Sequence, residues 1–80
     1  MPRFSQRRLD REAQSFDASA ARSAAAAVSG EQAAADPTNS GLTRTLAGRA
    51  AKTARRNAAE YRAIARELRA GEIPDSVRLD

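Results

Sequence analysis

Apolar side chains recur at helical spacing in the first part of the chain. On a helical projection they fall within an arc of about 120°, and the set comprises Leu9, Ala13, Phe16, Ala20, Ala24, Ala27 and Val28. Ser5 can accept a hydrogen bond from an early backbone N–H, and Phe4 and Leu9 have the spacing of a hydrophobic staple. Gly30 suits the left-handed conformation that commonly follows a helix. The pattern predicts a helix over about 5–29.

A second amphipathic pattern occupies residues 42–70, with no glycine or proline after Ala50. Its apolar residues span an arc of about 120°, made up of Leu46, Ala47, Ala50, Ala54, Ala58, Tyr61, Ile64, Ala65 and Leu68. Arg66 and Arg69 oppose the negative end of the helix dipole in the last turn, and Gly71 suits the position after the helix. We expect a second helix over about 42–70.

Residues 30–41 separate the two patterns. Residues 31–35 could form one more helical turn, but Pro37 disfavours helix at Asp36, and residues 38–41 are all turn formers. We therefore predict a hinge over 30–41. After the second helix, the segment 72–80 contains Pro74 and is expected to be an irregular tail that either packs loosely across the hairpin or stays mobile.

The sizes of the apolar residues indicate how the two helices pair. The first helix has its large residues early and its alanines late, and the second has the reverse order. An antiparallel hairpin therefore sets large against large at its open end and alanine against alanine near the hinge, where helix axes can approach to about 8 Å. The predicted fold is an all-α antiparallel two-helix hairpin forming a single module over 1–80. Its candidate core or partner-binding residues are Leu9, Phe16, Leu46, Ala54, Tyr61, Ile64 and Leu68.

Large apolar side chains are scarce. Val, Ile, Leu and Phe together number 11 of 80 residues, whereas alanine alone numbers 20. Alanine favours helix but buries little apolar surface, so a helix forms readily while an isolated core is marginal. We expect a homo-oligomer, or a subunit of a larger complex in which dimerisation or a partner completes a helical bundle.

The residue types present argue against catalysis. The chain has no cysteine and no histidine, and it contains no phosphate loop, zinc-ligand spacing or dinucleotide fingerprint. Glu60 and Glu67 are expected to pair with neighbouring arginines such as Arg56 rather than to act as general acids. We predict a non-enzymatic protein with no cofactor, no metal and no small-molecule substrate.

Hydropathy gives no sign of a membrane segment. No apolar run approaches the roughly 20 residues that span a bilayer, and Phe4 is followed by polar residues rather than by the apolar region of a secretory signal. The expected location is the cytoplasm, with no membrane partner. Arginine outnumbers lysine 13 to 1 beside the abundant alanine, a bias that we associate with GC-rich bacterial or phage genomes.

The positive charge is concentrated in the second helix. Residues 42–70 carry a net charge of +6, residues 1–41 balance to zero, and residues 71–80 carry −2. The basic residues are Arg44, Arg49, Lys52, Arg55, Arg56, Arg62, Arg66 and Arg69. Most of them lie opposite the apolar arc. Either they only keep the outer face of an alanine helix soluble, or they follow a polyanion, because guanidinium groups hold phosphate oxygens in bidentate pairs.

Two functions follow from these alternatives. The first is binding of nucleic acid or a nucleoprotein complex through the arginine face, with an acidic protein surface as a further partner class. Asn57 could then read a base edge and Tyr61 could stack on a base, although both positions also suit the border or centre of the packed face. The second is a protein-interaction module, such as a phage, plasmid or bacterial adaptor, inhibitor or antitoxin-like protein, whose Ala-rich seam docks into a partner bundle.

Overall fold

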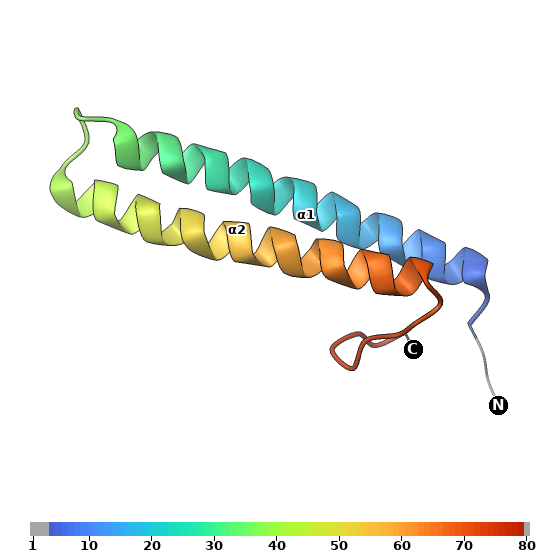
Figure 1. The fold of residues 1–80 in the computed structure, drawn as a ribbon. Helices are drawn as coiled ribbons and strands as arrows, with labels where there is room; N and C mark the ends of the chain where they lie inside the picture. The colour runs from blue at the N-terminus through green and yellow to red at the C-terminus, as the bar shows by residue number, and fades with distance from the viewer. Residues whose placement is uncertain (1–3, 80) are drawn as a thin grey trace.

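The computed structural model describes residues 4–79 and consists of two long antiparallel helices. Helix α1 comprises Gln6–Ala35 and helix α2 comprises Gly41–Arg69. They lie side by side along their whole length in a rod with extents of 57 × 18 × 17 Å (Figure 1). The described residues contain no strand. The predicted all-α antiparallel hairpin is confirmed.

Three of the predicted helix ends are confirmed by their capping contacts. The Ser5 hydroxyl accepts a hydrogen bond from the Arg8 N–H, and the Ser40 hydroxyl accepts one from the Thr43 N–H. Each hydroxyl satisfies a backbone donor that has no partner within the helix. At the other end of α2, Gly71 has a φ of 83°, the left-handed conformation expected for the residue after a helix.

The end of the first helix differs from the prediction. Helix α1 does not stop near residue 29 but continues through Gly30 to Ala35, so only residues 36–40 connect the helices instead of the predicted hinge 30–41. Gly30 faces α2, and a Cβ on it would lie only 2.9 Å from the Ala47 carbonyl oxygen. The glycine therefore serves close helix contact rather than helix termination.

Side chains of the connection hold it in a compact turn. The Asp36 carboxylate accepts hydrogen bonds from both the backbone N–H and the hydroxyl of Thr38, at 2.9 and 2.7 Å. These two bonds, the hydroxyl bond first, lower the pKa of Asp36 from its ordinary value. The Asn39 amide donates to the Ala33 carbonyl at 3.0 Å, satisfying an acceptor at the end of α1. The turn residues thus cap one helix before starting the next.

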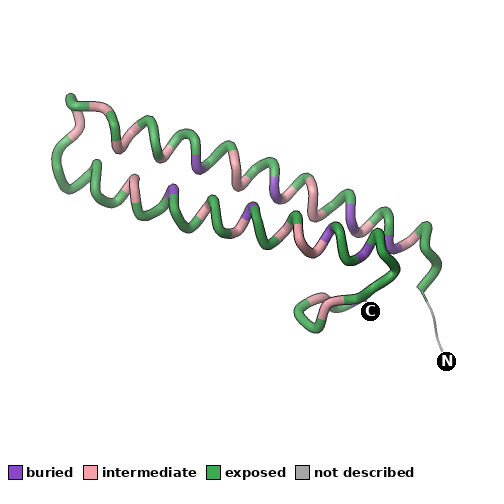
Figure 2. Tube along the Cα trace, in the orientation of Figure 1, coloured by how far each residue is buried: buried purple, intermediate pink, exposed green. Residues whose placement is uncertain are grey.

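The core is a seam of alanines along the facing sides of the helices (Figure 2). Ala13, Ala20 and Ala27 of α1 are buried at intervals of seven residues, as are Ala51, Ala58 and Ala65 of α2. A seven-residue repeat of buried positions is typical of coiled-coil packing, in which the contact seam repeats every 3.5 residues. Because each position contributes only a methyl group, the helices can approach closely.

Side-chain size decreases from the open end of the hairpin toward the turn. Phe16 packs against Tyr61 with ring centroids 6.0 Å apart, and Gly30 meets Ala47 two heptads further along α1. Beyond the rings toward the open end, Leu9 and Leu68 belong to one buried cluster. The predicted match of large with large and small with small is confirmed.

The tail folds back onto the open end. Leu79 is buried in the same cluster as Leu9 and Leu68, and Val77 packs against that cluster. The Gln6 side-chain amide donates to the carbonyls of Leu68 and Arg69, both at 3.2 Å. These bonds tie the start of α1 to the end of α2. Of the two behaviours left open for the tail, the structure shows packing against the hairpin.

The apolar arc predicted for the second helix is wrong near the turn. Leu46 and Ala50 are exposed, whereas Ala51 is buried. The prediction advanced by 100° per residue, but a seam with a 3.5-residue repeat drifts from that projection by about 20° per heptad. Over the three heptads that separate Leu46 from Leu68, the drift carries Leu46 out of the interface.

Candidate functional site: the cationic edge of helix α2

Most basic side chains of α2 lie along one edge and the adjoining outer face of the helix. All of them are exposed. We call this surface the cationic edge; its members are Arg49, Lys52, Arg55, Arg56, Arg62, Arg66 and Arg69. Arg44 lies apart from it, at the turn, where its Nε donates to the Ala34 carbonyl at 2.9 Å. The same packing that buries the alanine seam thus turns these cations toward solvent.

Two members of the cationic edge are paired with carboxylates of α1. Arg55 makes a bidentate contact with Glu31, with N–O distances of 2.7 and 2.6 Å, and Arg69 bonds Asp17 at 2.6 Å. The bonds from Arg55 lower the pKa of Glu31, and the carboxylate raises the pKa of Arg55. These two cations are therefore already partly neutralised.

The other five members have no such contact. Within residues 4–79, no hydrogen bond or ion pair engages the side chains of Arg49, Lys52, Arg56, Arg62 and Arg66. Consecutive members of this set are three to six residues apart along α2. Of the eight basic residues singled out from the sequence, these five are available to an external anion.

The position of Arg62 is set by the two ion pairs. Arg62 is seven residues from both Arg55 and Arg69, and Ala24 is seven residues from both Glu31 and Asp17. Because the ion pairs fix the register of the two helices, Arg62 stands opposite Ala24. On this side of the interface α1 therefore places a carboxylate opposite Arg55 and another opposite Arg69. Opposite Arg62 it places only the methyl group of Ala24, so no acid faces Arg62.

Two acidic residues do not behave as predicted. Among the described residues, neither Glu60 nor Glu67 forms an ion pair, whether with Arg56 or with another arginine. Glu60 is four residues after Arg56 and so only about 40° from it around the helix, and Glu67 lies seven residues further along the same side of α2. The cationic edge is therefore bordered on α2 by two carboxylates that do not pair with it.

The two side chains considered for base contacts lie elsewhere. Tyr61 is half-buried, and its ring packs against Phe16. Asn57 is half-buried, on the same side of α2 as Ile64, which packs against the core cluster. The exposed Phe4 ring is covered on one side by the Arg8 guanidinium, 4.6 Å from its centroid. The cationic edge therefore presents cations and small side chains but no aromatic ring.

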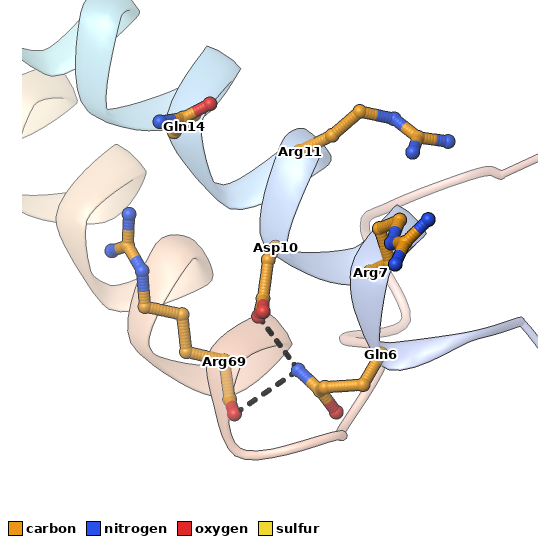
Figure 3. A pocket seen from close by; sticks show the side chains of 6 residues that line it. All are labelled: Gln6, Arg7, Asp10, Arg11, Gln14 and Arg69. Carbon is orange, nitrogen blue, oxygen red and sulfur yellow. Dashed lines mark hydrogen bonds between the residues drawn. The ribbon is translucent and has the colours of Figure 1, made fainter.

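The hairpin adds basic residues that the sequence argument missed. A shallow hollow of about 610 Å³ at the open end is lined by Arg7 and Arg11 of α1 together with Arg69 of α2 (Figure 3). Asp10 also lines it and accepts a hydrogen bond from Gln6 at 2.8 Å. Summing charge by segment concealed these arginines, because residues 1–41 are neutral overall. The predicted antiparallel pairing could have revealed them, since it places the start of α1 beside the end of α2.

Neither helix, over the residues described, combines the length and apolarity needed to cross a membrane. Comparison of the chain with protein-family models, with curated proteins and with solved structures gave no match. The fold and the surface chemistry together define an alanine-seamed helical hairpin with a basic edge. Its function is inferred from that surface.

Proposed function

We propose that the protein is a non-enzymatic, cytoplasmic nucleic-acid-binding protein that uses the cationic edge of α2. The observation that carries the proposal is the placement of five unpaired cations along one exposed edge of a straight helix. Arginine and lysine at such spacing neutralise successive phosphates, and guanidinium groups hold phosphate oxygens in bidentate pairs. A nucleoprotein complex offers the same phosphates.

The mechanism is electrostatic. Each phosphate that a cation neutralises releases condensed counterions, so affinity falls with salt concentration in proportion to the number of contacts. Two features support binding with little sequence preference. Phosphate contacts carry no sequence information. The two candidates for base contacts on α2, Asn57 and Tyr61, are half-buried and lie away from the cationic edge.

The test compares two charge-matched variants. Replacing Arg62 and Arg66 by glutamine removes two unpaired cations from the edge, while replacing Arg22 and Arg78 removes the same charge from exposed positions elsewhere. The edge variant should weaken binding to nucleic acid at least tenfold at low salt, and the control should weaken it less than threefold. Circular dichroism should show equal helicity in both. Equal affinities for the two variants, or tighter binding to poly-glutamate than to nucleic acid, would count against the proposal.

A protein-interaction function is the second candidate, favoured by apolar side chains that remain exposed. Leu42 is 71% and Leu46 is 53% exposed on neighbouring turns of α2, and Val28 of α1 is 44% exposed. The seam once considered for docking, including Ala54, is occupied by α1, so a partner would have to use these residues instead. Light scattering of the Leu42→Ser/Leu46→Ser variant tests this candidate: loss of an oligomer would support it, and an unchanged mass would oppose it.

A further inference from the structure

The five unpaired cations form two groups along α2. Arg49, Lys52 and Arg56 make up the group nearer the turn, and Arg62 and Arg66 make up the group nearer the open end. With a rise of about 1.5 Å per residue, the centres of the two groups are about 18 Å apart. Between them the same face of the helix carries the methyl groups of Ala59 and Ala63, and Glu60 lies at the border of that face, about 40° from Arg56. The cationic edge is therefore discontinuous, with two positive groups separated by a stretch that holds no cation.

This spacing resembles the width of a groove in a nucleic-acid duplex. The major groove of B-form DNA is about 12 Å wide, so phosphates on its two rims lie somewhat further apart than that. Two cationic groups about 18 Å apart can each reach one rim. The methyl groups of Ala59 and Ala63 would then face the open groove, where there is no phosphate to neutralise.

The dimensions of the hairpin fit a position over the groove rather than within it. The rod is 18 × 17 Å in cross-section, wider than the groove. The Glu31–Arg55 and Asp17–Arg69 contacts, which involve two members of the cationic edge, join α1 to α2, so α2 does not enter the groove alone. The rod would lie across the groove with its cationic edge on the phosphates.

The absence of an exposed ring on the cationic edge argues against a single-stranded target. Proteins that bind single strands without sequence preference stack bases on aromatic side chains. Within residues 4–79 the rings are Phe4, Phe16 and Tyr61; Phe16 and Tyr61 pack on each other and Phe4 lies under Arg8. Binding without stacking depends on charge density alone, and a duplex carries the higher density.

We propose that the ligand of the cationic edge is duplex DNA, contacted through phosphates on both rims of the major groove. This inference rests on the proposed function. It goes beyond that function by naming the form of nucleic acid and by assigning each cationic group to a different strand.

The experiment measures affinity for a 20-base-pair duplex and for a 40-nucleotide single strand of mixed sequence, which carry about the same number of phosphates, over a series of salt concentrations. Five phosphate contacts predict a slope of log affinity against log salt of about −4.5 on the duplex. Arg62→Gln/Arg66→Gln should make that slope shallower by about 1.8, and Arg49→Gln/Lys52→Gln should do the same, because each pair of cations meets one strand. The duplex should bind at least tenfold more tightly than the single strand at low salt.

Three results decide the matter. Tighter duplex binding with slope changes in both variants supports the inference. Equal or tighter binding of the single strand overturns it, as does a slope that responds to only one of the two variants, while the proposed function survives. No salt-dependent binding to either DNA overturns the inference, and the same result with RNA of the same two forms overturns the proposed function as well.

Discussion

Gly30 of α1 touches the backbone of α2 at Ala47. A Cβ placed on Gly30 would lie 2.9 Å from the Ala47 carbonyl oxygen and 3.0 Å from the Ala51 Cβ. Real side chains essentially never approach backbone so closely, so the two helices could not keep this separation with any larger residue at position 30. The close approach near the turn depends on this one glycine.

Gly30→Ala should destabilise the hairpin by about 1–3 kcal/mol, the usual cost of overpacking, despite the gain in helix propensity. Gly48→Ala is the matched control, because a Cβ there would meet only the Ala34 Cβ at 3.8 Å, an ordinary contact. The control should be neutral or stabilise by up to about 1 kcal/mol. Thermal unfolding followed by circular dichroism measures both. Equal effects at the two positions would show that Gly30 is not a contact point.

Ala24→Glu should neutralise Arg62 without removing any cation. The new carboxylate would stand opposite Arg62 and complete the row between the two existing ion pairs. An exposed pair of this kind changes stability by less than about 1 kcal/mol, but it should make the salt dependence of DNA binding shallower by about 0.9, the contribution of one phosphate contact.

Ala26→Glu is the control for that substitution. It brings the same charge two residues away, about 200° around α1 and so on the opposite edge of the hairpin. Its salt dependence should match that of the unmodified protein. If both glutamates change the slope equally, net charge rather than the position of Arg62 governs binding.

Lowering the pH should reduce the stability of the hairpin, partly through protonation of Glu31. Its pKa is lower in the folded chain than its ordinary value of 4.5, because Arg55 stabilises the carboxylate. The stabilisation is therefore fully present well above pH 4.5 and is lost as the pH falls through the folded-state pKa. Asp36 contributes in the same direction through its hydrogen bonds from Thr38.

The Glu31→Gln variant tests this contribution. Its stability between pH 6 and pH 3 should fall less steeply than that of the unmodified protein, as urea unfolding at a series of pH values would show. An unchanged pH dependence would mean that the ion pair adds nothing in solution.

Leu68→Ala should be among the most damaging single truncations. Leu68 is fully buried between the helices and the tail, and such truncations typically cost about 2–5 kcal/mol. Leu42→Ala removes the same atoms from a side chain that is 71% exposed, and should change stability by less than about 0.5 kcal/mol. Urea unfolding distinguishes the two. A large loss at Leu42 would instead indicate that this residue is covered by a second copy or a partner.

The sequence was sufficient for the features that depend on local chemistry. Ser5 has a side chain and Gly71 has a backbone freedom that suit one position at a helix end, and the structure places them there. The order of large and small residues predicted that large side chains meet toward the open end, and the contact of Phe16 with Tyr61 is one case of it.

Features that depend on particular contacts between the two helices were harder to predict from the sequence. Gly30 has the local signature of a helix end, and only the proximity of Ala47 explains why the helix continues. Likewise, the charge of Arg55 and Arg69 could be counted from the sequence, but their neutralisation by Glu31 and Asp17 depends on the interhelical register. The five unpaired cations could be separated from the paired ones only after that register was known.

The alanine repeat has a consequence for the uniqueness of the fold. Because buried alanines recur every seven residues on both helices, sliding α2 along α1 by one heptad would again match methyl groups with methyl groups at most levels. The energetic distinction between the native alignment and a slipped one therefore falls mainly on two positions, the ring pair Phe16–Tyr61 and the close contact of Gly30 with Ala47. The ion pairs distinguish less, because a one-heptad slip would bring Arg62 opposite Glu31 or Asp17 and so keep one pair. A slip would separate the two rings, move Gly30 away from Ala47 and prevent the five-residue turn from joining the helices, so a few residues select one alignment from several that the alanines alone would tolerate.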